Sequence, residues 1–236
     1  MDDRLFPVDV STLQERVYGQ LRSALHQGKF MPGEVVTIRS LASALGTSAM
    51  PVREAIQRLV AERALVQLPN RTIRVAPFDL EIFADHTRTR GAIEGHAAYR
   101  AAVRQPGDLI DRLTAANRDM RSAIAAGDAD GTLDANRAFH FALYGGAESP
   151  QLLEIITSLW LRSGPYINLA LRRVPEAKTV FERGTRNHDR IIDAIERGDP
   201  KMAQFCLALD IRLTAMWFRH WYRGQDASSE NLGPAA

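Results

Sequence analysis

Apolar positions recur with helical spacing three times within the first 61 residues, and each recurrence predicts a short helix. The first helix is expected over about residues 13–27. The other two lie within Arg39–Ala61, where Gly46 suits a left-handed helix end and Ser48 is an N-cap candidate. Apolar residues at helical spacing form the expected buried stripe of the last helix: Val52, Ile56, Leu59 and Val60.

Two short runs rich in β-branched and other apolar residues follow this helix pair. They cover Leu65–Leu68 and Thr72–Val75, and the turn Pro69–Arg71 separates them. A hairpin directly behind two helices joined by a tight turn forms a wing. The pattern therefore predicts a winged helix-turn-helix domain over residues 10–76, whose last helix enters the DNA major groove.

The remainder of the chain shows no convincing strand pattern. Gly, Pro, Asp and Ser residues divide it into amphipathic segments joined by short connections, which favours an antiparallel bundle over residues 79–222. The polar residues 223–236 are expected to be disordered. The predicted fold class is mainly α, with six helices in the second domain: 79–103, 108–126, 129–145, 150–172, 175–197 and 200–221.

Composition adds few constraints to this picture. The net charge of the 236 residues is +2, with a small basic excess in the first 76 residues that fits DNA contact. The single cysteine, Cys206, excludes an intrachain disulfide. No signal-peptide pattern and no apolar run of membrane-spanning length is visible, so we expect a cytoplasmic protein without membrane contact, associated with the nucleoid when bound to its operator.

Several motifs resemble known families. The first 76 residues are similar to the GntR family of bacterial transcription regulators, and the helical part looks like the FCD domain of the FadR subfamily, with the six helices of its VanR-type branch. The GntR motifs are Pro32-Gly33-Glu34, Ile38-Arg39-Ser40-Leu41-Ala42, Leu45-Gly46, and Ser48 with Pro51-Val52-Arg53-Glu54-Ala55-Ile56. The FCD motifs are Arg90 with Glu94, Asn136 to His140, His188 with Ile191–Ile195, and Gly198-Asp199.

The resemblance implies a transcriptional regulator, in most members a repressor, and not an enzyme. Such a protein is a homodimer that binds double-stranded operator DNA. Its helical domains bind a small organic acid as effector, often beside a divalent metal. Effector binding then changes the affinity for the operator.

The candidate DNA-reading residues lie on the helix pair and at the wing tip. Arg53 follows core-facing Val52 and can bind guanine O6 and N7 through both arms of its guanidinium. Two positions depart from the family pattern, since Ala49 replaces a usual arginine and Thr72 a usual glycine. The full set is Arg39, Ser48, Met50, Arg53, Asn70 and Arg71.

The candidate metal ligands begin with Asn136 and His140, which share one helix face because they are four residues apart. The resemblance adds His188 and Asp210 from other helices. The family's usual set is one aspartate and three histidines, so the carboxylate has moved to the last position. Two imidazoles, one carboxylate and one amide oxygen would suit Zn²⁺, Ni²⁺ or Mn²⁺.

The effector is expected to contact Arg90, His140, His188 and Asp210, with the Arg90 guanidinium on a carboxylate. Arg90 could instead form a salt bridge with Glu94, one helical turn away. Two other readings of the helical domain stay open. It could be a metal-free ligand sensor, or a metal-dependent enzyme with a DNA-binding anchor, although no motif supplies a catalytic residue.

Overall fold

The computed structural model describes residues 13–173 and 177–230, with side chains up to residue 223. The chain forms two compact units. One comprises Met1–Pro77 with Leu161–Tyr166, and the other comprises Phe78–Trp160 with Ile167–Ala236. Residues 10–12, where the first domain was expected to begin, lie outside the described part of the chain.

The first unit is built around the contact between two helices, α1 and α3. Apolar side chains of both helices and of a small sheet form one buried core that includes Leu21, Val52 and Leu59. The predicted winged helix-turn-helix is therefore confirmed. In the described residues its elements are α1 (Leu13–His26), β1 (Val35–Val36), α2 (Ile38–Ala44), α3 (Ala49–Ala61), β2 (Leu65–Gln67) and β3 (Ile73–Val75).

The sheet of this unit has one strand more than the predicted hairpin. Its antiparallel order is β1-β3-β2, with Val36 and Gln67 flanking Ile73 on either side. The short strand β1 lies just before α2 in sequence. A two-residue strand leaves no periodic pattern, because its identity depends on pairing with a distant strand.

Local residues fix the ends of the helix pair. Gly46 has φ +60°, the left-handed conformation that the sequence predicted after α2. Thr37 is the N-cap of α2 and accepts a hydrogen bond from the Ser40 amide at 3.0 Å. Ser48 occupies the N-cap position of α3, as expected, but makes no side-chain capping bond.

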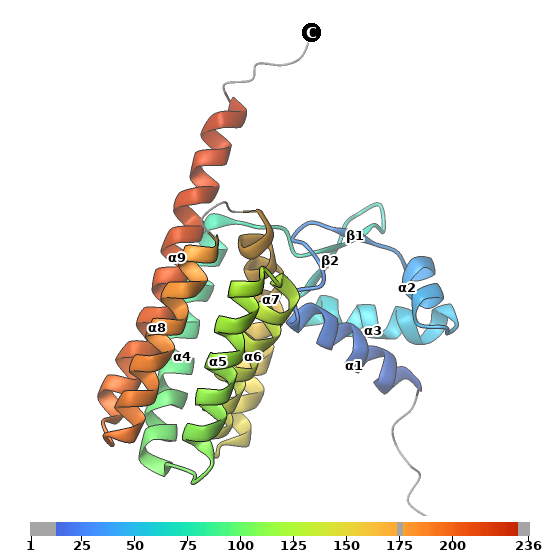
Figure 1. The fold of residues 1–236 in the computed structure, drawn as a ribbon. Coiled ribbons are helices and arrows are strands. Elements are labelled where there is room, and N and C mark those ends of the chain that lie inside the picture. Colours follow the sequence, from blue (N-terminus) through green and yellow to red (C-terminus); the bar gives the residue numbers. More distant parts are fainter. Residues whose placement is uncertain (1–12, 174–176, 231–236) are drawn as a thin grey trace, which may run out of the picture. The chain divides into compact units, whose positions relative to one another are not determined.

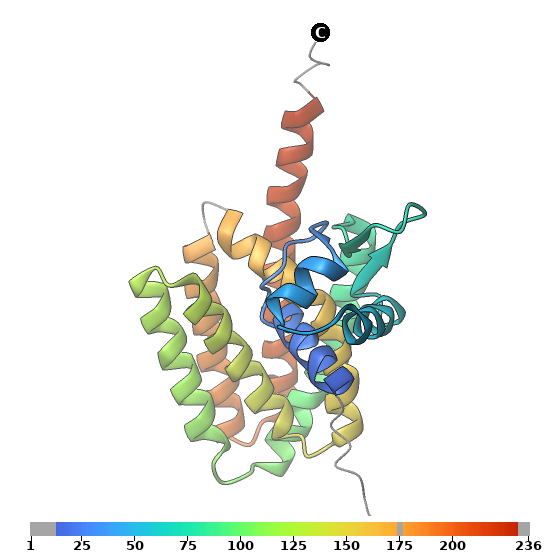
Figure 2. The same cartoon turned by 90° about the vertical axis from the view of Figure 1, so that its right-hand side faces the viewer.

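The second unit contains the bundle of α4–α9, except for Leu161–Tyr166 of α7, and its helices run side by side (Figures 1 and 2). The helix α4 packs most extensively on α9, and α5 on α6. With one exception, the helix ends lie within two residues of those predicted. The bounds are α4 Leu80–Arg104, α5 Leu109–Ala126, α6 Ala129–Gly145, α7 Pro150–Arg173, α8 Ala177–Glu196 and α9 Pro200–Glu230.

Capping explains why these boundaries could be predicted. Asp79 accepts hydrogen bonds from the amides of Glu81 and Ile82, and so starts α4. Asp128 caps α6 in the same way, through the amide of Gly131. Such bonds join neighbours in the sequence, so the residue types reveal them directly.

The exception is the end of α9, which continues to Glu230. The disordered tail predicted for residues 223–236 is therefore wrong for its first part. Each residue added to an existing helix gains a backbone hydrogen bond, and no proline interrupts the chain before Pro234. Residues 231–236 lie outside the described residues.

Candidate functional site

The residues expected to read DNA all lie exposed on the first unit. Arg53 projects from α3 beside Val52, which is fully buried, so the helix turns the guanidinium away from the core. Arg39 lies in the first turn of α2 and Met50 in the first turn of α3. The helix pair therefore presents these side chains to solvent, as an unliganded DNA-binding surface requires.

The wing tip is shaped by its own side chains. Asn70 Oδ1 accepts a hydrogen bond from the Thr72 amide at 3.0 Å, which engages the oxygen of Asn70 within the turn. Arg71 has φ +63° and therefore adopts the left-handed conformation. The strain of this turn falls on Arg71 and not on Thr72, although Thr72 replaces the family's usual glycine.

A neighbouring arginine of α3 has a structural role. Arg58 pairs with Glu15 at 2.8 Å, and its guanidinium lies 3.7 Å from the ring centroid of Tyr18 on α1. These contacts join α1 to the back of α3. Arg58 is thus held away from the surface that carries Arg53.

Three ionisable residues converge inside the second unit. His140 of α6, His188 of α8 and Asp210 of α9 are all buried, and one potential ligand atom from each lies within 4.8 Å of the others. The Nε2 atoms of His140 and His188 lie 3.7 and 4.0 Å from Asp210 Oδ2. Both distances are too long for hydrogen bonds. The two imidazole rings meet edge to face, with centroids 5.2 Å apart, and the three groups therefore surround a point without hydrogen bonds between them.

Outer contacts fix the orientation of the His188 ring. Asn117 donates through Nδ2 to the Thr185 carbonyl at 3.0 Å and to Asp189 at 2.8 Å, so its Oδ1 is the acceptor facing His188 Nδ1 at 3.2 Å. His188 Nδ1 then carries the proton and Nε2 an open lone pair. This buried Nε2 has no hydrogen-bond partner among the described residues.

A hydrogen bond also fixes the tautomer of His140. The Tyr144 hydroxyl donates to Glu94 and faces His140 Nδ1 at 3.1 Å, so the hydroxyl oxygen accepts the Nδ1 proton. The lone pair of His140 Nε2 is then also directed towards Asp210. Two imidazole lone pairs and a carboxylate facing one point form a donor set that a divalent cation satisfies.

The pKa shifts of the two histidines agree with metal binding by this cluster. Burial lowers the pKa of His188 to about 3, helped by the positive charge of Arg121. Burial also holds the pKa of His140 well below its ordinary value, with further contributions from His188 and Arg90. Both rings are therefore neutral near pH 7, the form that binds metal.

Asp210 is the carboxylate of the cluster. Burial raises its pKa to about 7, although the hydrogen bond from Asn187 at 3.2 Å opposes the shift. A buried negative charge is therefore costly here without a cation beside it. Asn136, the fourth predicted ligand, is half-buried one turn before His140 on α6.

Arg90 forms the salt bridge that was the alternative to effector binding. Its guanidinium makes two bonds with Glu94, at 2.5 and 3.0 Å, and lies 4.9 Å from the ring centroid of Trp160. Glu94 is fully buried and also accepts from Trp160 Nε1 at 3.1 Å. Through Tyr144, this ion pair is linked to His140 and so to the cluster.

Sequence reasoning missed several members of this network. Tyr144 lies four residues after His140, so helical spacing could have indicated it. Asn187 is adjacent to His188. Asn117 left no comparable signal, because it reaches the cluster from a helix far away in the sequence.

The family comparisons agree with this architecture. Residues 13–75 match "Bacterial regulatory proteins, gntR family" and residues 85–212 match the FCD domain. The chain therefore belongs to the GntR family of bacterial regulatory proteins and carries an FCD domain.

Similar proteins are named as regulators. The chain is 29% identical to the HTH-type transcriptional regulator McbR of Escherichia coli (strain K12), over 84% of this chain and 88% of McbR. It is 26% identical to the probable D-xylose utilization operon transcriptional repressor of Paenarthrobacter nicotinovorans, over 92% of this chain and 94% of that protein. The solved structure of E. coli McbR/YncC matches with a TM-score of 0.82 and 25% identity, over 90% of this chain and all of that one.

These matches define the class of the protein. It is a DNA-binding transcriptional regulator and not an enzyme, as the sequence predicted. Among the described residues, no helix combines the length and the apolar character of a membrane span.

Proposed function

We propose that this protein is an effector-responsive repressor in which residues 10–76 bind operator DNA and residues 79–222 bind a small organic acid beside a divalent metal. The observation that carries the proposal is the cluster of His140, His188 and Asp210, with both imidazole Nε2 lone pairs directed towards one carboxylate. Burying two imidazole lone pairs beside a carboxylate without hydrogen-bond partners costs free energy, and a bound ligand would offset this cost.

The proposed DNA contacts divide into two kinds. Arg53 reads guanine in the major groove, and Met50 contributes an apolar contact to a base edge. Arg39 and Ser48 position the helix pair on phosphates, while the wing tip with Asn70 and Arg71 reaches the minor groove. Since Ala49 removes one family arginine, Arg53 carries more of the discrimination between base sequences.

The proposed metal site uses His140 Nε2, His188 Nε2 and Asp210 Oδ2, with Asn136 as a fourth donor. Zn²⁺, Ni²⁺ or Mn²⁺ suits this mixture of nitrogen and oxygen donors. When bound, the metal supplies a positive charge that neutralises Asp210 and attracts an effector carboxylate. The side chains of Asn117 and Tyr144 hold the two rings in the binding tautomer.

Arg90 has a second role in this proposal. It lies next to the cluster through Glu94 and Tyr144, and 11% of its side chain remains exposed. An effector carboxylate that shares the guanidinium with Glu94 would alter the contacts of Trp160 and Tyr144. Such a change links effector binding to the packing of the bundle helices.

The remaining assignments follow the family resemblance. We place the chain in the FadR subfamily and its VanR-like branch, on the basis of six FCD helices. It acts as a homodimer in the cytoplasm and associates with the nucleoid through its operator. A winged domain from each subunit then reads one half-site.

Binding assays with the purified protein test this function. We expect specific binding to the DNA upstream of its own gene and of neighbouring genes. In a thermal-shift screen, small carboxylic acids and sugar acids should raise the melting temperature more strongly with Zn²⁺, Ni²⁺ or Mn²⁺ present. An acid found in this way should change operator affinity by about 5–150-fold.

Two results would contradict the proposal. A protein that binds the upstream DNA no better than unrelated DNA would not be a regulator of those genes. Stabilisation by an acid to the same degree after chelation would favour the metal-free sensor instead.

A further inference from the structure

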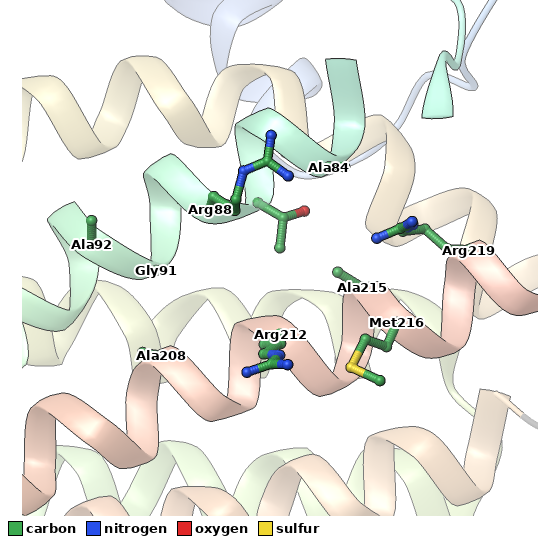
Figure 3. A pocket seen from close by; sticks show the side chains of 10 residues that line it. Ala84, Arg88, Gly91, Ala92, Ala208, Arg212, Ala215, Met216 and Arg219 are labelled. Carbon is green, nitrogen blue, oxygen red and sulfur yellow. The ribbon is translucent and has the colours of Figure 1, made fainter. Parts of the chain in front are cut away.

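A hollow lies between α4 and α9 in the second unit. Its volume of about 710 Å³ falls within the roughly 300–1,000 Å³ that is typical of small-molecule sites. Much of the lining consists of small residues, such as Ala84, Gly91 and Ala215, which leave room between the two helices. Figure 3 shows three arginines around this space, Arg88 from α4 with Arg212 and Arg219 from α9.

The helix register brings these arginines together. Gly91 of α4 lies against Ala208 of α9, and the two helices are antiparallel. Arg88 comes three residues before Gly91, and Arg212 comes four residues after Ala208, so these two arginines lie at nearly the same level on opposite helices. Arg219 follows Arg212 by seven residues, which places it two turns further along the same face of α9.

The lining of the hollow carries three positive charges and no negative one. The nearby acidic residues of α4, Glu81 and Asp85, lie outside the lining. Asp85 makes a 3.2 Å contact with Arg88, and both side chains remain largely exposed. Arg212 and Arg219 form no ion pair with any side chain of residues 13–173 and 177–223. The repulsion between the guanidinium groups is therefore only partly balanced by the protein itself.

The hydrogen-bonding groups of the hollow are donors. Arg219 Nε is buried and has no hydrogen-bond partner in the part of the chain that the structure describes. Thr87 also lines the hollow, but its hydroxyl already donates to the Phe83 carbonyl at 2.8 Å. The donors open to a ligand thus belong to the arginines, and a ligand must bring acceptor oxygens and negative charge.

We infer that the α4–α9 hollow binds a small organic molecule with two or more negative charges, as a phosphate ester or a dicarboxylate carries. Arg88 and Arg212 hold one anionic group from the two helices, because guanidinium groups bind phosphate and carboxylate oxygens in pairs. Arg219 holds a second anionic group about 11 Å further along α9. The body of the ligand lies against Met216 and the small residues between the arginines.

The shape of the hollow favours a small organic anion over other anionic occupants. The phosphates of duplex DNA lie on a convex surface, whereas these arginines surround a concave space. An inorganic ion would balance the charge but would leave most of the 710 Å³ to water beside the apolar side chain of Met216. The inference goes beyond the proposed function, since it uses neither the metal cluster nor Arg90.

Isothermal titration calorimetry of the full-length, DNA-free protein tests the inference. The probes are two dianions, glycerol 3-phosphate and succinate, at constant ionic strength in a buffer without other multivalent anions. At least one of them should bind at one site per chain, and the one that binds more tightly identifies the ligand group as phosphate ester or dicarboxylate. Acetate, with a single charge, should bind at least about tenfold more weakly.

Variants assign the binding to the hollow. Arg212→Ala and Arg219→Ala should each raise the dissociation constant about tenfold or more, because each removes charged hydrogen bonds to the ligand. Arg212 is exposed, so its replacement should leave the fold intact. Arg183→Ala is the matched control, since Arg183 is an exposed arginine of α8 outside the hollow, and it should bind like the wild type.

A second control separates this site from the proposed metal site. His140→Ala, and wild-type protein stripped of metal, should both bind the dianion as tightly as the untreated wild type. Failure of both dianions to bind the folded wild type would overturn the inference. Binding that His140→Ala abolishes, and that Arg212→Ala and Arg219→Ala leave unchanged, would also overturn it, while leaving the proposed function intact.

Discussion

The side chains proposed to read DNA are exposed, whereas those proposed to hold the metal are buried. Arg53 and Met50 extend into solvent from a helix whose other face forms the core of the first unit. His140, His188 and Asp210 lie inside the bundle and depend on Asn117 and Tyr144 for their orientation. Substitutions on the first surface should change binding without unfolding, while substitutions in the second site change stability as well.

The largest expected effect is on the stability of the bundle. Glu94→Gln leaves the Arg90 guanidinium in a buried position without its counter-charge, which should lower the free energy of unfolding by about 3–5 kcal/mol. Urea unfolding followed by tryptophan fluorescence measures this change.

The matched control is an exposed pair with the same spacing. Arg197 and Asp193 are four residues apart and make a 2.9 Å contact in water-exposed positions. Asp193→Asn should cost only about 0.3–0.5 kcal/mol. Equal losses of unfolding free energy in the two variants would show that the buried Arg90–Glu94 pair stabilises the protein no more than the exposed pair does.

Next in size is the loss of base recognition. Arg53→Ala should cost about 1–3 kcal/mol at each half-site, because one bidentate contact with guanine disappears. Fluorescence anisotropy with operator and unrelated DNA measures the loss, which should be confined to the operator.

Arg118→Ala is the control for that variant, since Arg118 is an exposed arginine of α5 in the second unit. It should bind the operator like the wild type. An unchanged operator footprint for Arg53→Ala would refute the assignment of α3 as the recognition helix.

The support of the metal ligands gives a smaller effect. Asn117→Ala removes the acceptor that fixes the His188 tautomer, so metal affinity should fall about 10–100-fold. Competition with a chromogenic chelator measures it. Gln151→Ala, at an exposed position of α7, should bind metal normally, and full affinity in Asn117→Ala would mean that the ring needs no such support.

The smallest effect concerns the start of α2. Thr37→Ala removes the bond to the Ser40 amide and should destabilise the first unit by about 1 kcal/mol. Thermal unfolding of this variant is compared with that of Ser43→Ala, an exposed site within the same helix. If Ser43→Ala lost as much stability as Thr37→Ala, the lost N-cap would be excluded as the cause of the destabilisation.

The sequence predicted the features that local chemistry determines. Helix boundaries at Asp79, Asp128 and Gly46 follow from capping and from backbone conformation, and they were placed within two residues. The strand β1 was missed because two residues form it through pairing with a distant strand. The length of α9 was underestimated because polar residues can extend a helix that is already formed.

The residues of the candidate site also fall into two groups, those that local sequence spacing predicts and those that it does not. The shared face of Asn136 and His140 follows from helical spacing alone, but His188 and Asp210 came from the family resemblance. The structure brings His188 and Asp210 to His140 through the packing of three helices. Asn117 and the Arg90–Glu94–Trp160 contacts depend on tertiary packing, which periodicity does not report.

The metal content of the purified protein tests the central claim most directly. After incubation with Zn²⁺, Ni²⁺ or Mn²⁺ and removal of free ions, elemental analysis of the wild type should find about one ion per chain. His140→Ala should reduce this to background, while His220→Ala, which removes an exposed histidine, should retain it. Full metal content in folded His140→Ala protein would contradict the assignment of the site.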